Sequence, residues 1–231
     1  MRSRTTYLYL VLAAFLSFPF FDGARTVISR LQQQSLAPDQ LRLAIQGFMN
    51  VIFEALPLVL GMLICSVFAT YAVTIDKNKR TLESLLATPL SLRQVWLGKS
   101  LAVALPSVIM ALVVSLVVVL VVNVRLVAPV AGSYVMPSVL SWVAGLVIVP
   151  LLVFVGVCLV TLLQLIIVNP RIATFVFTGI FLAVYMGTIT EATASWNFAF
   201  IFLVIAVFFA ALVLFLARFL TKERVVLSSK G

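Results

Sequence analysis

Long apolar runs, separated by short polar segments, make up most of the sequence. A helix needs about 20 mostly apolar residues to cross the hydrocarbon core of a bilayer. Six segments reach or approach that length: Tyr7–Phe21, Val51–Ile75, Leu101–Asn123, Val139–Val168, Ile172–Ile189 and Phe198–Leu220. The pattern predicts an all-α polytopic membrane protein with six transmembrane helices, forming a single transmembrane domain over residues 1–231.

The composition excludes several other classes of protein. Of the 231 residues, 64% are hydrophobic and 10% are charged, whereas a soluble domain is about half apolar and about a quarter charged. The absence of histidine removes the commonest metal ligand and general base, and no metal site is predicted. Cys65 and Cys158 lie inside apolar runs, so we interpret them as small core residues rather than as a disulfide framework.

The first segment, Tyr7–Phe21, has an alternative interpretation as a signal peptide, because Arg2 and Arg4 precede it. A cleavage site needs small residues near the end of the apolar run. The sequence Phe18-Pro19-Phe20-Phe21-Asp22 lacks them at the right positions, so we favour a retained span.

The basic residues indicate how the spans are oriented. With both termini placed in the cytoplasm, 12 of the 16 Lys and Arg residues fall on the cytoplasmic side, as membrane proteins generally require. The other four lie in two predicted outer loops, Asp22–Asn50 and Val124–Ser138. The chain is therefore predicted to be a multi-pass protein of the cell (plasma) membrane. We assign its net charge of +9 to topology and membrane lipid rather than to nucleic acid, because the basic residues flank apolar runs.

The polar segment between the second and third spans, residues 76–99, begins with a predicted short helix. Leu82, Leu85 and Leu86 recur at i, i+3 and i+4, which gives this helix one apolar face. The periodicity alone leaves two interpretations open. The helix either docks in a groove of a soluble partner or rests on lipid headgroups.

A second helix is predicted to follow and to run into the third span. Pro89 disfavours helix at the residue before it, and Ser91 can cap the next helix. Trp96 falls near a predicted inner boundary, and Trp142 and Trp196 fall near predicted outer ones, as in aromatic belts. We expect Trp96 to anchor this second helix in the inner interface.

The run from Lys79 to Ser91, followed by Gly98 and Lys99, resembles the signature loop of the permeases of type-2 ABC exporters. These proteins carry a basic residue, then Thr-Leu-Glu, two leucines, Thr-Pro-Leu-Ser, and a Gly-Lys before the third span. In that family the loop is a coupling helix that docks on a nucleotide-binding subunit. The resemblance implies that six residues form the coupling surface: Arg80, Thr81, Leu82, Glu83, Leu85 and Leu86.

The resemblance further implies that the chain is the permease subunit of an ATP-driven exporter. A separate ABC ATPase subunit would bind ATP and magnesium, and this chain would hold no cofactor. A second permease copy or a related chain would complete the pathway. The alternative is a secondary transporter or a membrane scaffold that works without ATP. A proton-coupled carrier needs ionisable residues deep in its spans, and the sequence has almost none.

No motif in the chain itself predicts catalysis. Gly98-Lys99-Ser100 looks like the end of a phosphate-binding loop, but that motif needs a glycine where Arg93 stands. The sequence also lacks the common metalloprotease and serine-hydrolase motifs. We therefore expect a transport subunit rather than an enzyme.

Three polar residues within the predicted spans stand out. Glu54 lies close to the predicted outer end of the second span and is a candidate pathway or gate residue. The alternative interpretation of Glu54 is a solvated position near the outer surface. Asn123 and Gln164 either form hydrogen bonds between helices or line a pathway.

Overall fold

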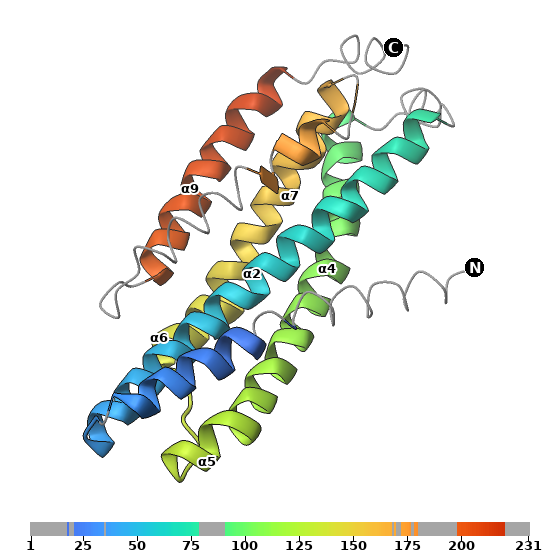
Figure 1. Cartoon of the computed structure of the whole chain (residues 1–231). Coiled ribbons are helices and arrows are strands. Elements are labelled where there is room, and N and C mark those ends of the chain that lie inside the picture. Colours follow the sequence, from blue (N-terminus) through green and yellow to red (C-terminus); the bar gives the residue numbers. More distant parts are fainter. Residues whose placement is uncertain are drawn as a thin grey trace. The chain divides into compact units, whose positions relative to one another are not determined.

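The computed structural model of the chain describes residues 18, 21–34, 36–78, 91–167, 169, 172–176, 178–179 and 198–219. The described residues are mostly helical and contain no strand, so the all-α prediction is confirmed for them (Figure 1). Residues 21–33 and 172–176 are helical. The labelled elements are α2 (Pro38–Asn78), α4 (Leu92–Val122), the π-helical turn η1 (Asn123–Val127), α5 (Ala128–Ala131), α6 (Val139–Val143), the π-helical turn η2 (Ala144–Ile148), α7 (Val149–Ile166), α9 (Phe198–Leu216) and the 3₁₀ turn η3 (Ala217–Phe219).

Within the described residues, four helical stretches are long and apolar enough to cross a membrane: Pro38–Asp76, Leu92–Ala131, Val139–Ile166 and Ala199–Leu216. They correspond to the second, third, fourth and sixth predicted spans. The first and fifth predicted spans lie largely outside the described residues. The most apolar window of Pro38–Asp76 is 78% buried, against 22% for that of Ala199–Leu216. α2 is therefore a core helix, whereas α9 turns most of its apolar surface outward, as a lipid-facing helix does.

α2 begins at Pro38 rather than at Val51. The predicted outer loop over Asp22–Asn50 is therefore mostly helical in its described residues, and its placement on the outer side stays a prediction. Proline suits the first turn of a helix, where no N–H donor is needed, and Asp39 places a negative charge at the positive end of the helix dipole. Hydropathy detects only the apolar part of such a helix and misses its polar beginning.

α4 begins directly after Ser91. The Gln94 N–H donates to Ser91 Oγ at 3.3 Å, and the Ser91 N–H donates to Gln94 Oε1 at 2.9 Å, which makes a reciprocal capping box. The prediction that a helix capped by Ser91 runs into the third span is confirmed. At the other end the helical path continues to Ala131 and stops at Gly132, whose φ is 66°. The predicted outer loop Val124–Ser138 is thus helical over its first half.

The two π-helical turns share a local cause. η1 and η2 both end two residues before a proline, Pro129 and Pro150 respectively. Proline lacks an N–H, and its ring clashes with the carbonyl four residues back in a regular helix. Those carbonyls belong to Arg125 and Leu146, which lie inside the π-helical turns. The wider turn accommodates each proline without ending the helical path.

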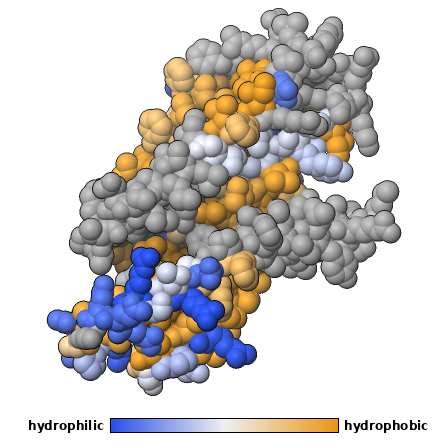
Figure 2. Space-filling view, viewed as in Figure 1, coloured by the Kyte–Doolittle hydropathy of each residue, from blue (hydrophilic) through white to orange (hydrophobic). Residues whose placement is uncertain are grey.

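The chain divides into two compact units, and the long helices contribute segments to both. Unit 1 draws on residues 1–61, 109–150 and 193–201, and unit 2 draws on residues 62–108, 151–192 and 202–231. Figure 2 shows the hydrophilic residues of unit 1 gathered at one end of the visible face, over the helix of residues 21–33 and the beginning of α2. Each unit also buries polar side chains of its own, and these define the candidate site.

Candidate functional site

Glu54 lies on α2 inside unit 1, where only 5% of its surface is exposed. Since α2 begins at Pro38, Glu54 lies several turns from the start of the helix. The side chain is enclosed by the chain, which disagrees with the alternative of a solvated surface position. The place of Glu54 near the outer end of the span stays a prediction. The Ser141 side chain lies close to the carboxylate, while Glu54 Oε2 is buried and has no hydrogen-bond partner in the described part of the chain.

Glu54 is the last member of a polar row along α2. Gln46, Asn50 and Glu54 recur every four residues, so they share one face of the helix. Gln46 Nε2 donates to the Met136 carbonyl at 3.3 Å, and Asn50 Oδ1 accepts the Ser138 N–H at 2.8 Å. The first two side chains are half-buried and Glu54 is fully buried, so the row runs inward. Its unsatisfied oxygen is at the buried end.

The backbone beside Glu54 is opened by Pro57. Proline has no N–H to donate to the carbonyl four residues back, which is that of Phe53. This freed carbonyl faces Gly145 in η2: a Cβ built on Gly145 would lie 3.0 Å from Phe53 O and 2.7 Å from Phe53 Cε1. Glycine is therefore required for the close approach of η2 to α2.

Two aromatic residues, one on each helix, lie next in sequence to Glu54 and to Ser141. Phe53 precedes Glu54, and Trp142 follows Ser141. Their ring centroids are 4.5 Å apart with the planes tilted by 51°, a favourable aromatic contact. Sequence reasoning identified Glu54 but missed Phe53, Gly145 and Ser141. The i, i+4, i+8 spacing of the polar row was the available signal, and the predicted loop boundary at Asn50 obscured it.

Asn123 fixes the segment that leads to this site. Asn123 Nδ2 donates to the Val135 carbonyl at 2.8 Å, and its Oδ1 accepts the Val135 N–H at 3.2 Å. The Asn123 side-chain amide thus forms with the backbone of Val135 the two hydrogen bonds that the backbone of a neighbouring strand would form. The residue closes the connection between α5 and α6, a role that sequence reasoning did not consider.

In unit 2, Trp96 ties the first turns of α4 to α7. Its indole Nε1 donates to the Cys158 carbonyl at 3.1 Å and to Thr161 Oγ1 at 3.2 Å. Ser100, one turn further along α4, bonds to the same Thr161 hydroxyl at 2.6 Å. Trp96 is 5% exposed. The expected interfacial anchor is therefore wrong, because the indole N–H bonds to another helix rather than facing the headgroups.

An ion pair joins the ends of α2 and α4. Lys99 Nζ bonds to Asp76 Oδ2, so the two helices are linked beside the segment that connects them. Gly98, Lys99 and Ser100 lie inside α4. They are therefore part of a helix and do not form the phosphate-binding loop that these residue types suggest. Residues 79–90, which connect the two helices, lie outside the described residues. All six predicted coupling residues belong to this segment.

Gln164 is the second buried polar centre of unit 2. Its Nε2 donates to Thr174 Oγ1 at 2.6 Å and to Thr70 Oγ1 at 3.2 Å, which joins α7 to α2 and to residues 172–176. Gln164 is completely buried. Of the two interpretations of Gln164, the structure therefore bears out hydrogen bonding between helices.

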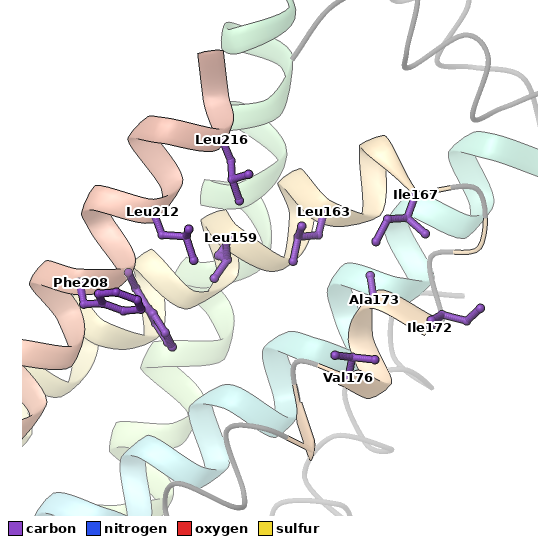
Figure 3. A pocket seen from close by; sticks show the side chains of 10 residues that line it. Leu159, Leu163, Ile167, Ile172, Ala173, Val176, Phe208, Leu212 and Leu216 are labelled. Atoms are coloured by element: carbon purple, nitrogen blue, oxygen red, sulfur yellow. The ribbon is translucent and has the colours of Figure 1, made fainter. Parts of the chain in front are cut away.

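A cavity of about 490 Å³ lies in the same unit between α7, α9 and the helical residues 172–176 (Figure 3). Its lining in the described residues is wholly apolar: Leu159, Leu163, Ile167, Ile172, Ala173, Val176, Phe208, Phe209, Leu212 and Leu216. Such a lining offers no hydrogen bond or charge and can hold only apolar groups.

Comparison with known families agrees with this helical, apolar architecture. Residues 2–180 match the model of the ABC-2 family transporter proteins. The chain belongs to the ABC-2 family. It is therefore a membrane permease of an ABC transporter, and the resemblance seen in the sequence is confirmed at the level of the family. No match was found among curated proteins or among solved structures.

Other chemistry is sparse in the described part of this ABC-2 permease. The described residues contain no group of three or more His, Cys, Asp or Glu side chains that could hold a metal ion. Cys65 and Cys158 are both free and buried, as expected for small core residues. Glu54 and the ion pair beside the connecting segment are thus the charged features around which a transport function can be built.

Proposed function

We propose that this ABC-2 permease is the membrane subunit of an ATP-driven exporter in the plasma membrane, with both termini in the cytoplasm. Residues 79–90 form the coupling helix, and Arg80, Thr81, Leu82, Glu83, Leu85 and Leu86 contact a separate ATPase subunit. That subunit binds ATP and magnesium. Two permease copies, or one copy and a related chain, enclose the pathway.

The observation that carries the proposal is the ion pair between Lys99 and Asp76, taken with the family match. A segment that transmits force must be held firmly at both ends. Only two residues separate Asp76 from the start of the proposed coupling helix. Because the pair links α2 to α4, a push on that helix moves both transmembrane helices together.

The hydrogen bonds of Trp96 extend this linkage to a third helix. Trp96 and Ser100 on α4 both bond to Thr161 on α7. A displacement of the beginning of α4 is therefore passed directly to α7, whose own polar contacts reach α2 through Gln164. Unit 2 has the connections that a relay between an ATPase and a pathway needs.

Co-purification with the ATPase tests the proposal. Glu83→Lys reverses the charge that is expected to pair with a basic group of the ATPase. We expect it to reduce the ATPase retained on the tagged chain, and the vanadate-sensitive ATP hydrolysis, by at least about tenfold, as loss of an interfacial charge pair does. Glu191→Lys makes the same charge change outside the proposed coupling helix and is the matched control.

Two results would contradict the proposal. The wild-type chain could retain no ATPase from gently solubilised membranes, or Glu83→Lys could retain as much ATPase as Glu191→Lys. Inside-out vesicles test the direction: export predicts that ATP added from the exposed cytoplasmic face drives accumulation of cargo in the vesicle lumen.

A further inference from the structure

The buried carboxylate of Glu54 has no ion-pair partner among the described residues. The described basic residues of unit 1 are all exposed: Arg25, Arg30, Arg42 and Arg125. None of them forms an ion pair with Glu54, and the ion pair found among the described residues is that of Lys99 and Asp76. A carboxylate in an apolar bundle is costly, and such groups usually pair with a cation or serve a transported species.

The position of Glu54 within the polar row suggests how a cation reaches it. Gln46 and Asn50 are half-buried, and their side chains bond to backbone groups of residues 136 and 138. Glu54 differs from them because Oε2 has no partner in the described residues. A polar group moving along this face of α2 passes two amides and meets an oxygen that is free to accept.

An aromatic pair at the neighbouring positions of the same two helices, Phe53 and Trp142, adds to the chemistry of a cation site. Trp142 is half-buried and contacts Phe53, the residue before Glu54, while Ser141, the residue before Trp142, lies close to Glu54. An indole ring attracts ammonium and guanidinium groups through its π face, most strongly where water is excluded. A carboxylate, a hydroxyl and an indole together recognise a positive nitrogen and offer nothing to an anion.

We propose that Glu54 and Trp142 bind the cationic nitrogen of an amphiphilic cargo, an ammonium or guanidinium group carried on an apolar body. This assignment of a substrate class rests on the proposed transport function. The apolar surface of the surrounding helices suits the body of such a molecule, and Glu54 selects for its charge. A neutral amphiphile of the same shape gains no contact with Oε2, and an anionic one is repelled.

Three matched fluorescent probes test the charge selection: diphenylhexatriene, its trimethylammonium derivative and its propionic acid derivative. The chain is purified with its retained subunits in phosphatidylcholine nanodiscs, and binding is measured without ATP by energy transfer from tryptophan to the probe. We expect the wild type to bind the cationic probe about tenfold more tightly than the neutral one. Glu54→Gln removes this ratio, and Glu54→Asp keeps part of it.

Trp142 provides an independent pair of variants in case changes at Glu54 prevent assembly. Trp142→Phe keeps a π face, whereas Trp142→Leu keeps only apolar volume. Binding is then followed by probe anisotropy, because the substitution removes one of the three tryptophan donors. We expect the cation-to-neutral ratio to fall in Trp142→Leu and to persist in Trp142→Phe.

Three outcomes would overturn the inference: a wild type that does not distinguish the three probes, a ratio unchanged in Glu54→Gln, or an equal loss of all three probes in Glu54→Gln. An unchanged ratio with an altered pH profile of ATP hydrolysis would assign Glu54 to proton binding instead. Because binding is measured without ATP, these outcomes are distinct from failure of the proposed function, which appears as loss of the ATPase subunit.

Discussion

Glu54 in unit 1 and Gln164 in unit 2 are both buried polar side chains on helices that are otherwise apolar, and each has one oxygen without a hydrogen-bond partner in the described residues. Their surroundings differ. Gln164 is neutral and donates to two threonines on two other helical segments. Glu54 is a carboxylate close to the Ser141 side chain, and the residue before it, Phe53, contacts Trp142.

We interpret this difference as the one between a structural contact at Gln164 and the functional contact proposed for Glu54. Hydrogen bonds between neutral side chains hold helices together in lipid at about 0.6 kcal/mol each, and an unused amide oxygen adds only a modest cost. A carboxylate in the same setting costs about 3 kcal/mol. A chain that keeps a charge at this cost gains something other than stability from it. Four substitutions test this contrast, and they follow in order of expected effect.

Gln164→Glu should cause the largest change, because it places in unit 2 a buried carboxylate like that of Glu54 in unit 1. It removes the amide N–H groups that donate to Thr70 and Thr174, and it adds a charge with no partner. We expect the free energy of unfolding to fall by about 3 kcal/mol. Unfolding in mixed micelles, titrated with SDS and followed by circular dichroism, measures this. An unchanged midpoint of unfolding would show that the cluster around Gln164 tolerates a charge. The contrast between Glu54 and Gln164 would then be lost.

Gly145→Ala tests whether the close approach beside Glu54 is needed. The added Cβ would lie 2.7 Å from Phe53 Cε1 and 3.0 Å from the Phe53 carbonyl oxygen, so the helices must separate. We expect a loss of about 2 kcal/mol in the same titration. Gly47→Ala, on α2 in the same unit, meets nothing within 4 Å and should be stabilising by about 0.5 kcal/mol. Equal effects of the two substitutions would show that η2 does not pack on α2 in this way.

Glu54→Gln is the reverse of the change at Gln164 and should have the opposite sign. It removes a buried charge without a partner and keeps the shape of the side chain. We expect the free energy of unfolding to rise by about 1 kcal/mol. A loss of stability would mean that the carboxylate is paired in the folded chain, and Glu54 would then be a structural residue like Gln164.

Thr70→Val should have the smallest effect. Thr70 Oγ1 bonds to Thr174, to Gln164 and to the Ser66 carbonyl, so we expect a loss of about 0.6 kcal/mol in the SDS titration. Thr74→Val, one turn along α2, is the control because Thr74 Oγ1 has no partner in the described residues, and its replacement should be neutral. If both variants lose the same stability, the polar contacts of unit 2 do not hold its helices together.

Sequence reasoning predicted the parts of this molecule that depend on local physics. Four apolar runs became helices, and α4 starts where Ser91 and Gln94 can cap it. It failed where the answer depends on a neighbouring helix. An indole near a span end suits a headgroup region or another helix equally well, and Trp96 bonds to α7.

The candidate site shows the same limit. Glu54 was recognisable because a carboxylate in an apolar run is unusual, but its burial was not predicted, because the polar start of α2 was taken for a loop. The contact between Phe53 and Gly145 could not be predicted, since it joins residues far apart in the sequence. Gly145 was visible only as a small residue in an apolar run. Packing between helices made it part of the site.

The most direct test of the account measures stability and charge selection on the same preparations of Glu54→Gln and Thr70→Val. We predict that Glu54→Gln unfolds at a higher SDS fraction than the wild type but loses its preference for the trimethylammonium probe. Thr70→Val should unfold at a lower SDS fraction and keep that preference. If stability and selectivity change in parallel in both variants, then Glu54 has no role separate from folding, and the functional contrast between the two units is contradicted.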